Sequence, residues 1–374
     1  MPLRNNAALW ICAFSLLGLC SSRALAFDGQ PQTQTTQQKI QPTPLPADVD
    51  PSDPAVPVWM RPANMPTKKE TTPAPNVPAG RGAVGEVTKG DSGYRMIVQS
   101  NEVILPVTVL DQKRHLVTTL SRNDFVVYED DQPQQIVNFR SDDVPVSIGI
   151  LVDNSGSMRE KRAAVTKAVV NLVKASNKDD EAFVVNFNDE PYLDQDFTSD
   201  INLMREALDR LDSRGGTALY EAVIAAADHL AKLGRKDKKV LLVITDGEDN
   251  ESRQTLEEAI RNVQNENGPT IYTIGILGGE GKERRAKRAL EALSLQTGGV
   301  AFFPKNLDEV DEVSQQVARD IRNQYTITYK PTNPQVNGGY RRVRVVARAS
   351  GYKDLQIRTK SGYFAGQQKT ASVR

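Results

Sequence analysis

Short apolar runs alternate with amphipathic stretches over the middle of the chain. Between residues 146 and 322, runs rich in β-branched residues are followed by stretches whose apolar residues recur at helical spacing. The strand-like runs are 146–152, 183–187, 192–197, 240–245, 270–277 and 300–303, and the helix-like stretches are 159–175, 200–211, 218–233, 256–263, 283–295 and 307–321. Repeated units of this length predict an α/β fold with a doubly wound, mostly parallel sheet that helices cover on both faces.

The two flanks of this region carry strand-like patterns of another kind, separated by polar, Pro-containing or Gly-containing turns. These runs are 95–110, 125–128 and 136–139 before it, and 324–330, 340–349 and 355–359 after it. Neither flank alone makes a convincing sheet pair with two covered faces, so we predict one β-sandwich built from both, with the α/β region inserted between them. The predicted units are N-terminal strands (94–144), an α/β domain (145–323), C-terminal strands paired with the first set (324–366) and a flexible tail (367–374).

The first 26 residues have the pattern of a signal peptide. Arg4 precedes an apolar run over 7–19, and Ala24-Leu25-Ala26 fits the rule for cleavage after Ala26. The apolar run is shorter than the roughly 20 residues that span a bilayer, and no later stretch approaches that length. We therefore expect a secreted or periplasmic protein without a transmembrane helix in its mature part. Lipidation of Cys20 is an alternative, which the large residue before it disfavours.

The segment 27–93 differs in composition from the rest of the chain. Twelve of the 53 residues from Asp28 to Gly80 are Pro, interleaved with Gln, Thr and Ala. Such a segment cannot bury enough apolar surface to offset its chain entropy, so we predict a disordered linker. The alternative is a proline-rich recognition segment with Trp59 and Met60 as anchors.

The charge balance and the cysteine count narrow the function classes. The 374 residues include 47 Lys and Arg against 47 Asp and Glu, so the chain lacks the basic excess that nucleic-acid binding requires, and we expect no nucleic-acid partner. Two histidines, His115 and His229, are too few for a His-rich zinc site. Both cysteines lie in the signal peptide, so the mature chain can form no disulfide.

Carboxylates and hydroxyls gather at the predicted strand ends. Asp153, Ser155 and Ser157 follow the first strand on a tight turn, Thr217 opens a helix after two glycines, and Asp246 ends the strand 240–245. Short oxygen ligands of this kind suit hard cations such as Mg²⁺. Each fragment alone is more often a helix cap or an Asx turn. Together, in this order, they predict a divalent-cation site.

This arrangement resembles the von Willebrand factor type A (VWFA) domain, whose metal-ion-dependent adhesion site (MIDAS) takes an Asp-x-Ser-x-Ser loop, a Thr and an Asp from three loops. The resemblance covers residues 146–322 and implies a Rossmann-like sheet order of 3-2-1-4-5-6, so that two carboxylates end neighbouring strands where the order reverses. It implies that Asp153, Ser155, Ser157, Thr217 and Asp246 bind Mg²⁺, with Mn²⁺ or Ca²⁺ as alternatives. With its export signal and β-rich flanks, the chain looks like the exported bacterial VWFA-related proteins.

In that family the open coordination position typically takes a carboxylate from a partner protein. The resemblance therefore implies an adhesion or interaction module that binds an acidic side chain without turnover, and not an enzyme. One alternative is a structural or assembly protein of the cell envelope. Another is a metal-dependent hydrolase with Asp153 or Ser155 as nucleophile, which the missing Gly-x-Ser-x-Gly elbow and phosphate loop disfavour.

Two charged segments outside this motif have alternative interpretations. Glu248 and Asp249 follow the last site residue and could take a second cation such as Ca²⁺, but a solvated acidic loop is the simpler expectation. The run 282–288, with five basic residues in seven, could contact an anionic partner, but it is also typical of the exposed face of a helix.

Overall fold

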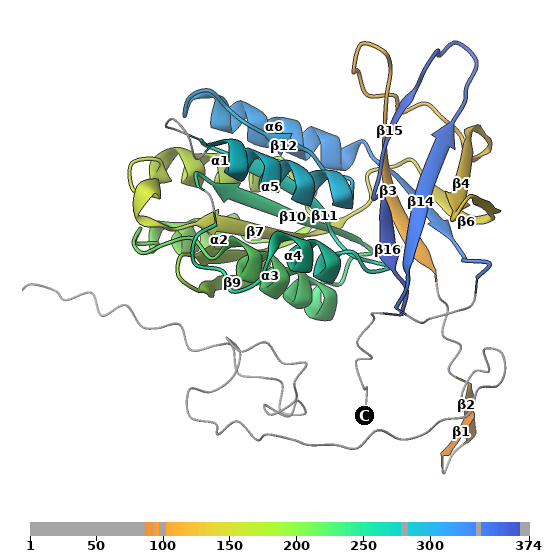
Figure 1. The fold of residues 1–374 in the computed structure, drawn as a ribbon, viewed down its shortest axis with the longest axis horizontal. Coiled ribbons are helices and arrows are strands. Elements are labelled where there is room, and N and C mark those ends of the chain that lie inside the picture. Colours follow the sequence, from red (N-terminus) through yellow and green to blue (C-terminus); the bar gives the residue numbers. More distant parts are fainter. Residues whose placement is uncertain are drawn as a thin grey trace, which may run out of the picture. The chain divides into compact units, whose positions relative to one another are not determined.

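The computed structural model describes residues 87–90, 93–96, 102–247, 249–277, 283–333 and 338–366 (Figure 1). The predicted signal peptide, most of the predicted linker and the predicted tail lie outside these residues. Strands β1 (Val87–Gly90) and β2 (Gly93–Met96) pair antiparallel, a pairing that the sequence analysis did not predict in or beside the linker. Among the residues described, no helix combines the length and apolar composition that a bilayer crossing requires.

A six-stranded sheet forms the centre of the α/β domain. Its strands are β7 (Val146–Asp153), β8 (Glu181–Phe187), β9 (Pro191–Thr198), β10 (Lys238–Thr245), β11 (Thr270–Gly275) and β12 (Ala301–Phe302). They lie in the order β12-β11-β10-β7-β8-β9, and all pairs are parallel except that of β8 with the edge strand β9. Every residue of β7 is buried, because both faces of a central parallel strand are covered. The predicted fold class is confirmed.

Six helices cover this sheet within the described residues. They are α1 (Arg162–Lys174), α2 (Ile201–Asp209), α3 (Leu219–Leu233), α4 (Leu256–Val263), α5 (Glu283–Thr297) and α6 (Glu309–Arg322). Helices α1, α2 and α6 bury apolar residues against one face, and α3, α4 and α5 against the other; Figure 1 shows α1 and α6 on the side opposite α3 and α4. Asp200 caps α2 by accepting a 2.8 Å hydrogen bond from the Asn202 amide, as its position in the sequence predicts.

Two antiparallel four-stranded sheets form the β-sandwich, in the orders β15-β3-β13-β6 and β16-β14-β4-β5. The strands are β3 (Val103–Leu110), β4 (Phe125–Glu129), β5 (Gln132–Gln134), β6 (Ile136–Arg140), β13 (Tyr325–Tyr329), β14 (Tyr340–Ala347), β15 (Gln356–Arg358) and β16 (Gly362–Phe364). Strand β13 lies between β3 and β6, and β14 pairs with β4, so each sheet needs both flanks of the chain. The α/β domain is inserted between them, as predicted.

Strands β5 and β16 were not predicted. Both are three-residue strands at the edge of a sheet. Strand β5 contains Pro133, which lies in a Pro-containing stretch that we predicted as a turn between the runs 125–128 and 136–139. Proline is tolerated at such an edge because its missing N–H would face away from the neighbouring strand. Runs this short carry no measurable alternation, so their pairing depends on the longer strands β4 and β14.

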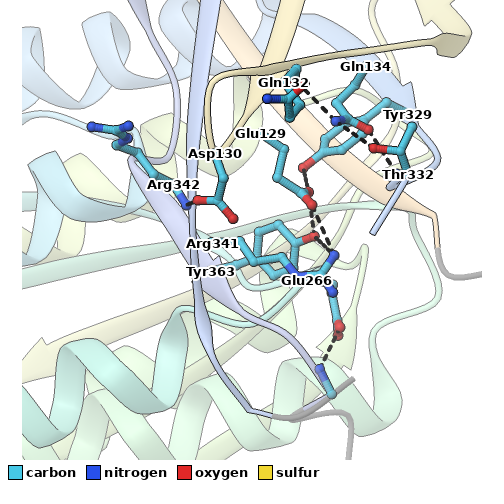
Figure 2. Close-up of polar contacts among 11 residues, drawn as sticks. Glu129, Asp130, Gln132, Gln134, Glu266, Tyr329, Thr332, Arg341, Arg342 and Tyr363 are labelled. Atoms are coloured by element: carbon cyan, nitrogen blue, oxygen red, sulfur yellow. Dashed lines mark hydrogen bonds and ion pairs between the residues drawn. The ribbon is translucent and has the colours of Figure 1, made fainter. Parts of the chain in front are cut away.

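The core of the sandwich contains a buried ionic cluster (Figure 2). Glu129 Oε1 accepts a 2.9 Å bond from Arg341 Nη1, and Glu129 Oε2 accepts 2.7 Å bonds from the hydroxyls of Tyr329 and Tyr363. All four side chains are at least nine-tenths buried. A buried carboxylate is tolerated when its oxygens are paired in this way, and the cluster ties β4 to three strands of the C-terminal flank.

Candidate metal centre

The predicted site residues lie on three loops at the carboxyl edge of the six-stranded sheet. Strands β7 and β10 are neighbours, and their register pairs Val152 with Ile244, which places Asp153 beside Thr245. Strand β8 follows β7 in the chain but lies on its other side, so the strand order reverses between β7 and β10. The crevice at such a reversal is where ligands of open α/β sheets bind.

A chain of hydrogen bonds joins four of the five predicted residues. The Ser155 amide donates to Asp153 Oδ1 at 2.8 Å, and the Ser155 and Ser157 hydroxyl oxygens lie 3.1 Å apart. The Ser157 hydroxyl then donates to Asp246 Oδ1 at 2.9 Å, across the two loops. Residues separated by about ninety positions in the sequence therefore share one polar cluster.

The fifth residue, Thr217, lies on the third loop, which contacts the other two. The Gly156 amide donates to the Gly215 carbonyl at 3.3 Å, so this loop bonds to the loop of Ser155 and Ser157. A methyl group added to Gly247 would lie 3.9 Å from Thr217 Oγ1, which places the threonine hydroxyl beside the loop that carries Asp246. The structure therefore brings all five predicted residues to one place.

Glycine is required at position 215 for two reasons. Its φ of +74° is a conformation that residues with side chains rarely adopt, and an added Cβ would lie within 3 Å of the Asp189 carboxylate. That carboxylate accepts a 2.6 Å hydrogen bond from the Gly216 amide. Asp189 thus fixes the loop immediately before Thr217, and sequence reasoning did not identify it.

The electrostatics of the cluster favour a bound cation. Burial raises the pKa of Asp153, with a smaller contribution from the nearby charge of Asp246, although hydrogen bonds from Thr245 and Ser155 oppose the rise. The Thr245 hydroxyl donates to Asp153 Oδ2 at 2.5 Å. A buried carboxylate beside a second one is costly, and positive charge between them would offset that cost.

Lys161 supplies part of this positive charge. Its ammonium group donates to Asp246 Oδ2 and, at 3.4 Å, to the Ile276 carbonyl. Sequence reasoning identified neither Lys161 nor the role of Thr245. The available signals were weak: Lys161 follows Ser157 by one helical turn, and Thr245 directly precedes a predicted ligand.

The donor set fits a hard cation and not a soft one. Two carboxylates and three hydroxyls on short side chains are oxygen ligands of the kind that Mg²⁺ binds together with water. Among the described residues, no three His, Cys, Asp or Glu side chains converge as ligands for a metal ion. Any cation at this edge would therefore depend on the hydroxyls of Ser155, Ser157 and Thr217.

The neighbouring acidic residue Asp249 has a structural role. Its Oδ2 accepts hydrogen bonds from the Leu219 and Tyr220 amides, at 2.8 and 3.3 Å, so it satisfies the free amides at the start of α3. Asp249 is therefore a helix-capping residue and not simply a solvated acidic side chain, whereas the second cation stays an untested alternative. Glu248 lies outside the described residues.

The basic run on α5 is exposed as the simpler interpretation expects. Arg284, Arg285, Lys287 and Arg288 are all exposed, and Lys282 lies outside the described residues. Lys287 lies 4.0 Å from Glu291 one turn further along the helix.

The fold is that of an α/β domain with a cluster of carboxylates and hydroxyls at its strand reversal. Residues 148–248 match the family model of the von Willebrand factor type A domain, and this interval includes all five predicted site residues. This part of the chain is therefore similar to the VWFA domain, the family that its motif resembles. A comparison with curated proteins gave no match.

Solved structures with similar folds come from several bacteria. A von Willebrand factor type A protein from Catenulispora acidiphila is 16% identical over 74% of this chain and 78% of its own, with a TM-score of 0.43. An aerotolerance-related membrane protein from Bacteroides fragilis is 17% identical over 47% of this chain and 98% of its own, with a TM-score of 0.39. The vWF domain of the type V pili tip protein Mfa5 from Porphyromonas gingivalis is 15% identical over 48% and 96%, with a TM-score of 0.38.

Proposed function

We propose that the protein is an exported, metal-dependent protein-binding module. Asp153, Ser155, Ser157, Thr217 and Asp246 hold a divalent cation, Mg²⁺ with Mn²⁺ or Ca²⁺ as alternatives, and the cation supplies an open coordination position for a carboxylate of a partner protein. The observation that carries this proposal is the hydrogen-bonded chain from Asp153 to Asp246, because it assembles oxygen ligands from separate loops at the strand reversal.

The side chains already have the hydrogen bonding that such a site needs. The Ser157 hydroxyl donates its proton to Asp246 and therefore accepts the bond from the Ser155 hydroxyl, which leaves one lone pair of Ser157 for a cation. Thr245 and the Ser155 amide fix one oxygen each of Asp153, so this carboxylate is held in one orientation before any ligand arrives. The two carboxylates balance the charge of a divalent ion.

The same geometry supports binding without turnover. His229 is buried, packs against the rings of Phe183 and Phe197, and lies 2.8 Å from Asp196. His115 lies 3.3 Å from Asp111 in a turn of the sandwich. Neither histidine contacts the polar cluster, so within the described residues no histidine is placed as a general base for a hydrolytic step.

Calorimetric titration with MgCl₂ tests the metal part of the proposal. We expect wild-type protein to bind one Mg²⁺, Asp153→Ala to lose that binding, and Asp209→Ala, an exposed change on α2, to retain it. Partner capture from an envelope extract should then require Mg²⁺ and fail with chelator. Mg²⁺ binding that survives Asp153→Ala would contradict the site, and capture that ignores the chelator would favour an envelope assembly role. Mass spectrometry of the secreted protein should find Phe27 at its N-terminus.

A further inference from the structure

A groove between α1 and α2 runs along the helical face beside the candidate metal centre. It has a volume of about 450 Å³, and its floor includes the buried side chains of Val170 and Leu208. A second groove of about 580 Å³ lies between α1 and α6, and both grooves share Asn171 and Lys174. The two form one trough across the end of α1, which we call the α1 trough.

Basic side chains dominate the walls of the α1 trough. They are Arg162, Lys167, Lys174, Arg205, Arg319 and Arg322, whereas Asp209 is the one acidic residue among those that line it. The chain as a whole has equal numbers of acidic and basic residues, so this excess is local. Two nearby acids reduce it in part: Asp311 lies 3.7 Å from Lys167, and Asp143 lies 3.9 Å from Arg322.

Helix stabilisation explains only some of these charges. Lys174 lies in the last turn of α1, and Arg319 and Arg322 lie in the last turn of α6, where cations offset the helix dipole. Arg162 is in the first turn of α1, where a cation is unfavourable, and Arg205 is in the middle of α2. The helix dipole therefore does not account for the basic residues Arg162 and Arg205, at the end of the trough nearest the candidate metal centre.

That end of the trough is next to the metal-site loops. Arg162 follows Ser157 by five residues, and its guanidinium donates to the Leu211 carbonyl on the segment that leads to Thr217. From Arg162 to Lys174 the helix rises about 18 Å, at 1.5 Å per residue. An extended polypeptide covers that length with about five or six residues.

We propose that the α1 trough binds an extended acidic segment of the partner polypeptide, whose first carboxylate is the one offered to the metal centre. This inference rests on the proposed function and adds the class of partner sequence. Side chains of an extended segment alternate between two sides, so acidic residues at every second position can face Arg205 and Lys174 on the walls of the trough. The arginine side chains suit carboxylates because their planar fork can donate two parallel hydrogen bonds.

The test uses the full mature chain and two labelled peptides of twelve residues, one of alternating Glu and Val and one of alternating Gln and Val. Fluorescence anisotropy in Mg²⁺ should show binding of the acidic peptide only. Lys174→Glu with Arg205→Glu should weaken that binding about tenfold or more, since two attractive pairs become repulsive. The control, Arg284→Glu with Arg288→Glu, makes the same change of net charge on the exposed face of α5 and should stay within about twofold of wild type.

Separate measurements distinguish failure of the trough from failure of the metal site. Titration with MgCl₂ alone should give wild-type affinity for the Lys174 and Arg205 double variant. If wild-type protein does not bind Mg²⁺, the proposed function fails. If Mg²⁺ binds but the acidic peptide does not, or if both double variants bind it equally, the trough proposal is overturned.

One further outcome concerns the protein's own acidic residues. Asp48, Asp50 and Asp53 lie within six residues of one another in the proline-rich segment. A variant that lacks residues 40–60 should bind the acidic peptide with unchanged affinity. A gain of tenfold or more would mean that this segment competes for the trough, and would overturn its assignment to a partner.

Discussion

Replacing Thr245 by valine tests whether the metal centre depends on a buried hydrogen bond. The side chain of Thr245 is fully buried at the end of β10, and its hydroxyl donates to Asp153 Oδ2 at 2.5 Å. Thr245 Oγ1 also accepts a 3.2 Å bond from the Gly247 amide, in the loop of Asp246. Valine keeps the approximate shape but removes both bonds, so Asp153 is held only by Ser155, and the Gly247 amide loses this acceptor.

The size of the effect follows from the charge of the acceptor. A hydrogen bond to a charged group contributes about 1.5–3 kcal/mol, which corresponds to roughly 10-fold to 150-fold in a binding constant. Loss of a group that orients a metal ligand typically costs about 10-fold to 100-fold in metal affinity. We therefore expect Thr245→Val to weaken Mg²⁺ binding by about 10-fold to 100-fold.

The pH dependence gives this prediction a second readout. Burial raises the pKa of Asp153, and the hydrogen bond from Thr245 is the largest opposing contribution. Without that bond the pKa of Asp153 should rise further, so protons should compete more strongly with the cation as the pH falls. The loss of Mg²⁺ affinity in Thr245→Val should therefore be larger at acidic pH than at pH 8.

Isothermal titration with MgCl₂ measures both effects, and urea unfolding monitors the fold. Thr245→Ser is the matched control, because it retains the hydroxyl and should bind Mg²⁺ close to the wild-type affinity. If Thr245→Val also binds at the wild-type affinity, then either the hydroxyl does not orient Asp153 or Asp153 is not a ligand, and the derivation of the site is refuted.

Three other predictions concern charged groups beside the candidate site, in the sandwich and on the edge strand β9. Lys161→Met should raise Mg²⁺ affinity about fivefold in calorimetric titration, because the Lys161 ammonium competes with the cation for Asp246 by about 1 kcal/mol. Weaker Mg²⁺ binding by this variant would mean instead that Lys161 positions the Asp246 carboxylate. Glu129→Gln should lower the free energy of unfolding in urea by about 3–5 kcal/mol, because it leaves the buried Arg341 without its carboxylate. Adding Arg341→Met should recover much of this loss by removing the unpaired charge. An equal loss in the single and the double variant would contradict the ion pair of Glu129 with Arg341. Burial raises the pKa of Asp194 to about 7, so its ionisation should cost stability as the pH rises from about 4 to 7. The stability of Asp194→Asn relative to wild type should therefore increase over that range. Unfolding free energies of the two proteins that change in parallel with pH would contradict the shift.

The sequence predicted the elements that carry the site because those elements have strong local patterns. Strands β7 and β10 are covered on both faces, so each contains a largely apolar run that ends at a polar residue. The strand ends therefore marked Asp153 and Asp246 directly. Their proximity followed from the sheet order of the family that the motif resembles, and the structure has that order.

The residues that support the ligands could not be predicted in the same way. Lys161 reaches Asp246 across 85 positions in the sequence, and Asp189 reaches the Gly216 amide across 27. Such contacts depend on where the loops lie in three dimensions, and neither residue has a local pattern that distinguishes it from a solvated charge. The short strands β5 and β16 escaped prediction for a related reason, since their partners alone determine their conformation.

The connection between the α/β domain and the sandwich bears on whether the helix α6 can move when a ligand binds. Two residues separate α6 from β13, and the end of α6 is held by polar groups from both units. Asp320 accepts a 2.5 Å bond from the Tyr272 hydroxyl on β11 and a bond from Arg358 on β15. The buried Lys238 ammonium, at the start of β10, donates to the Ile321 carbonyl.

A sliding movement of α6 along its axis would break these contacts together. Each buried polar group left without a partner costs about 1–3 kcal/mol, so separating Asp320 and Ile321 from their three donors would cost several kcal/mol. A ligand can shift an equilibrium only by the difference in its affinity for the two states, and a difference of that size corresponds to more than a hundredfold. The metal centre lies at the opposite end of β10, beyond Thr245, and has no contact with this junction among the bonds described. We therefore expect the candidate metal centre to act as a preformed site, with α6 keeping its position when a ligand binds.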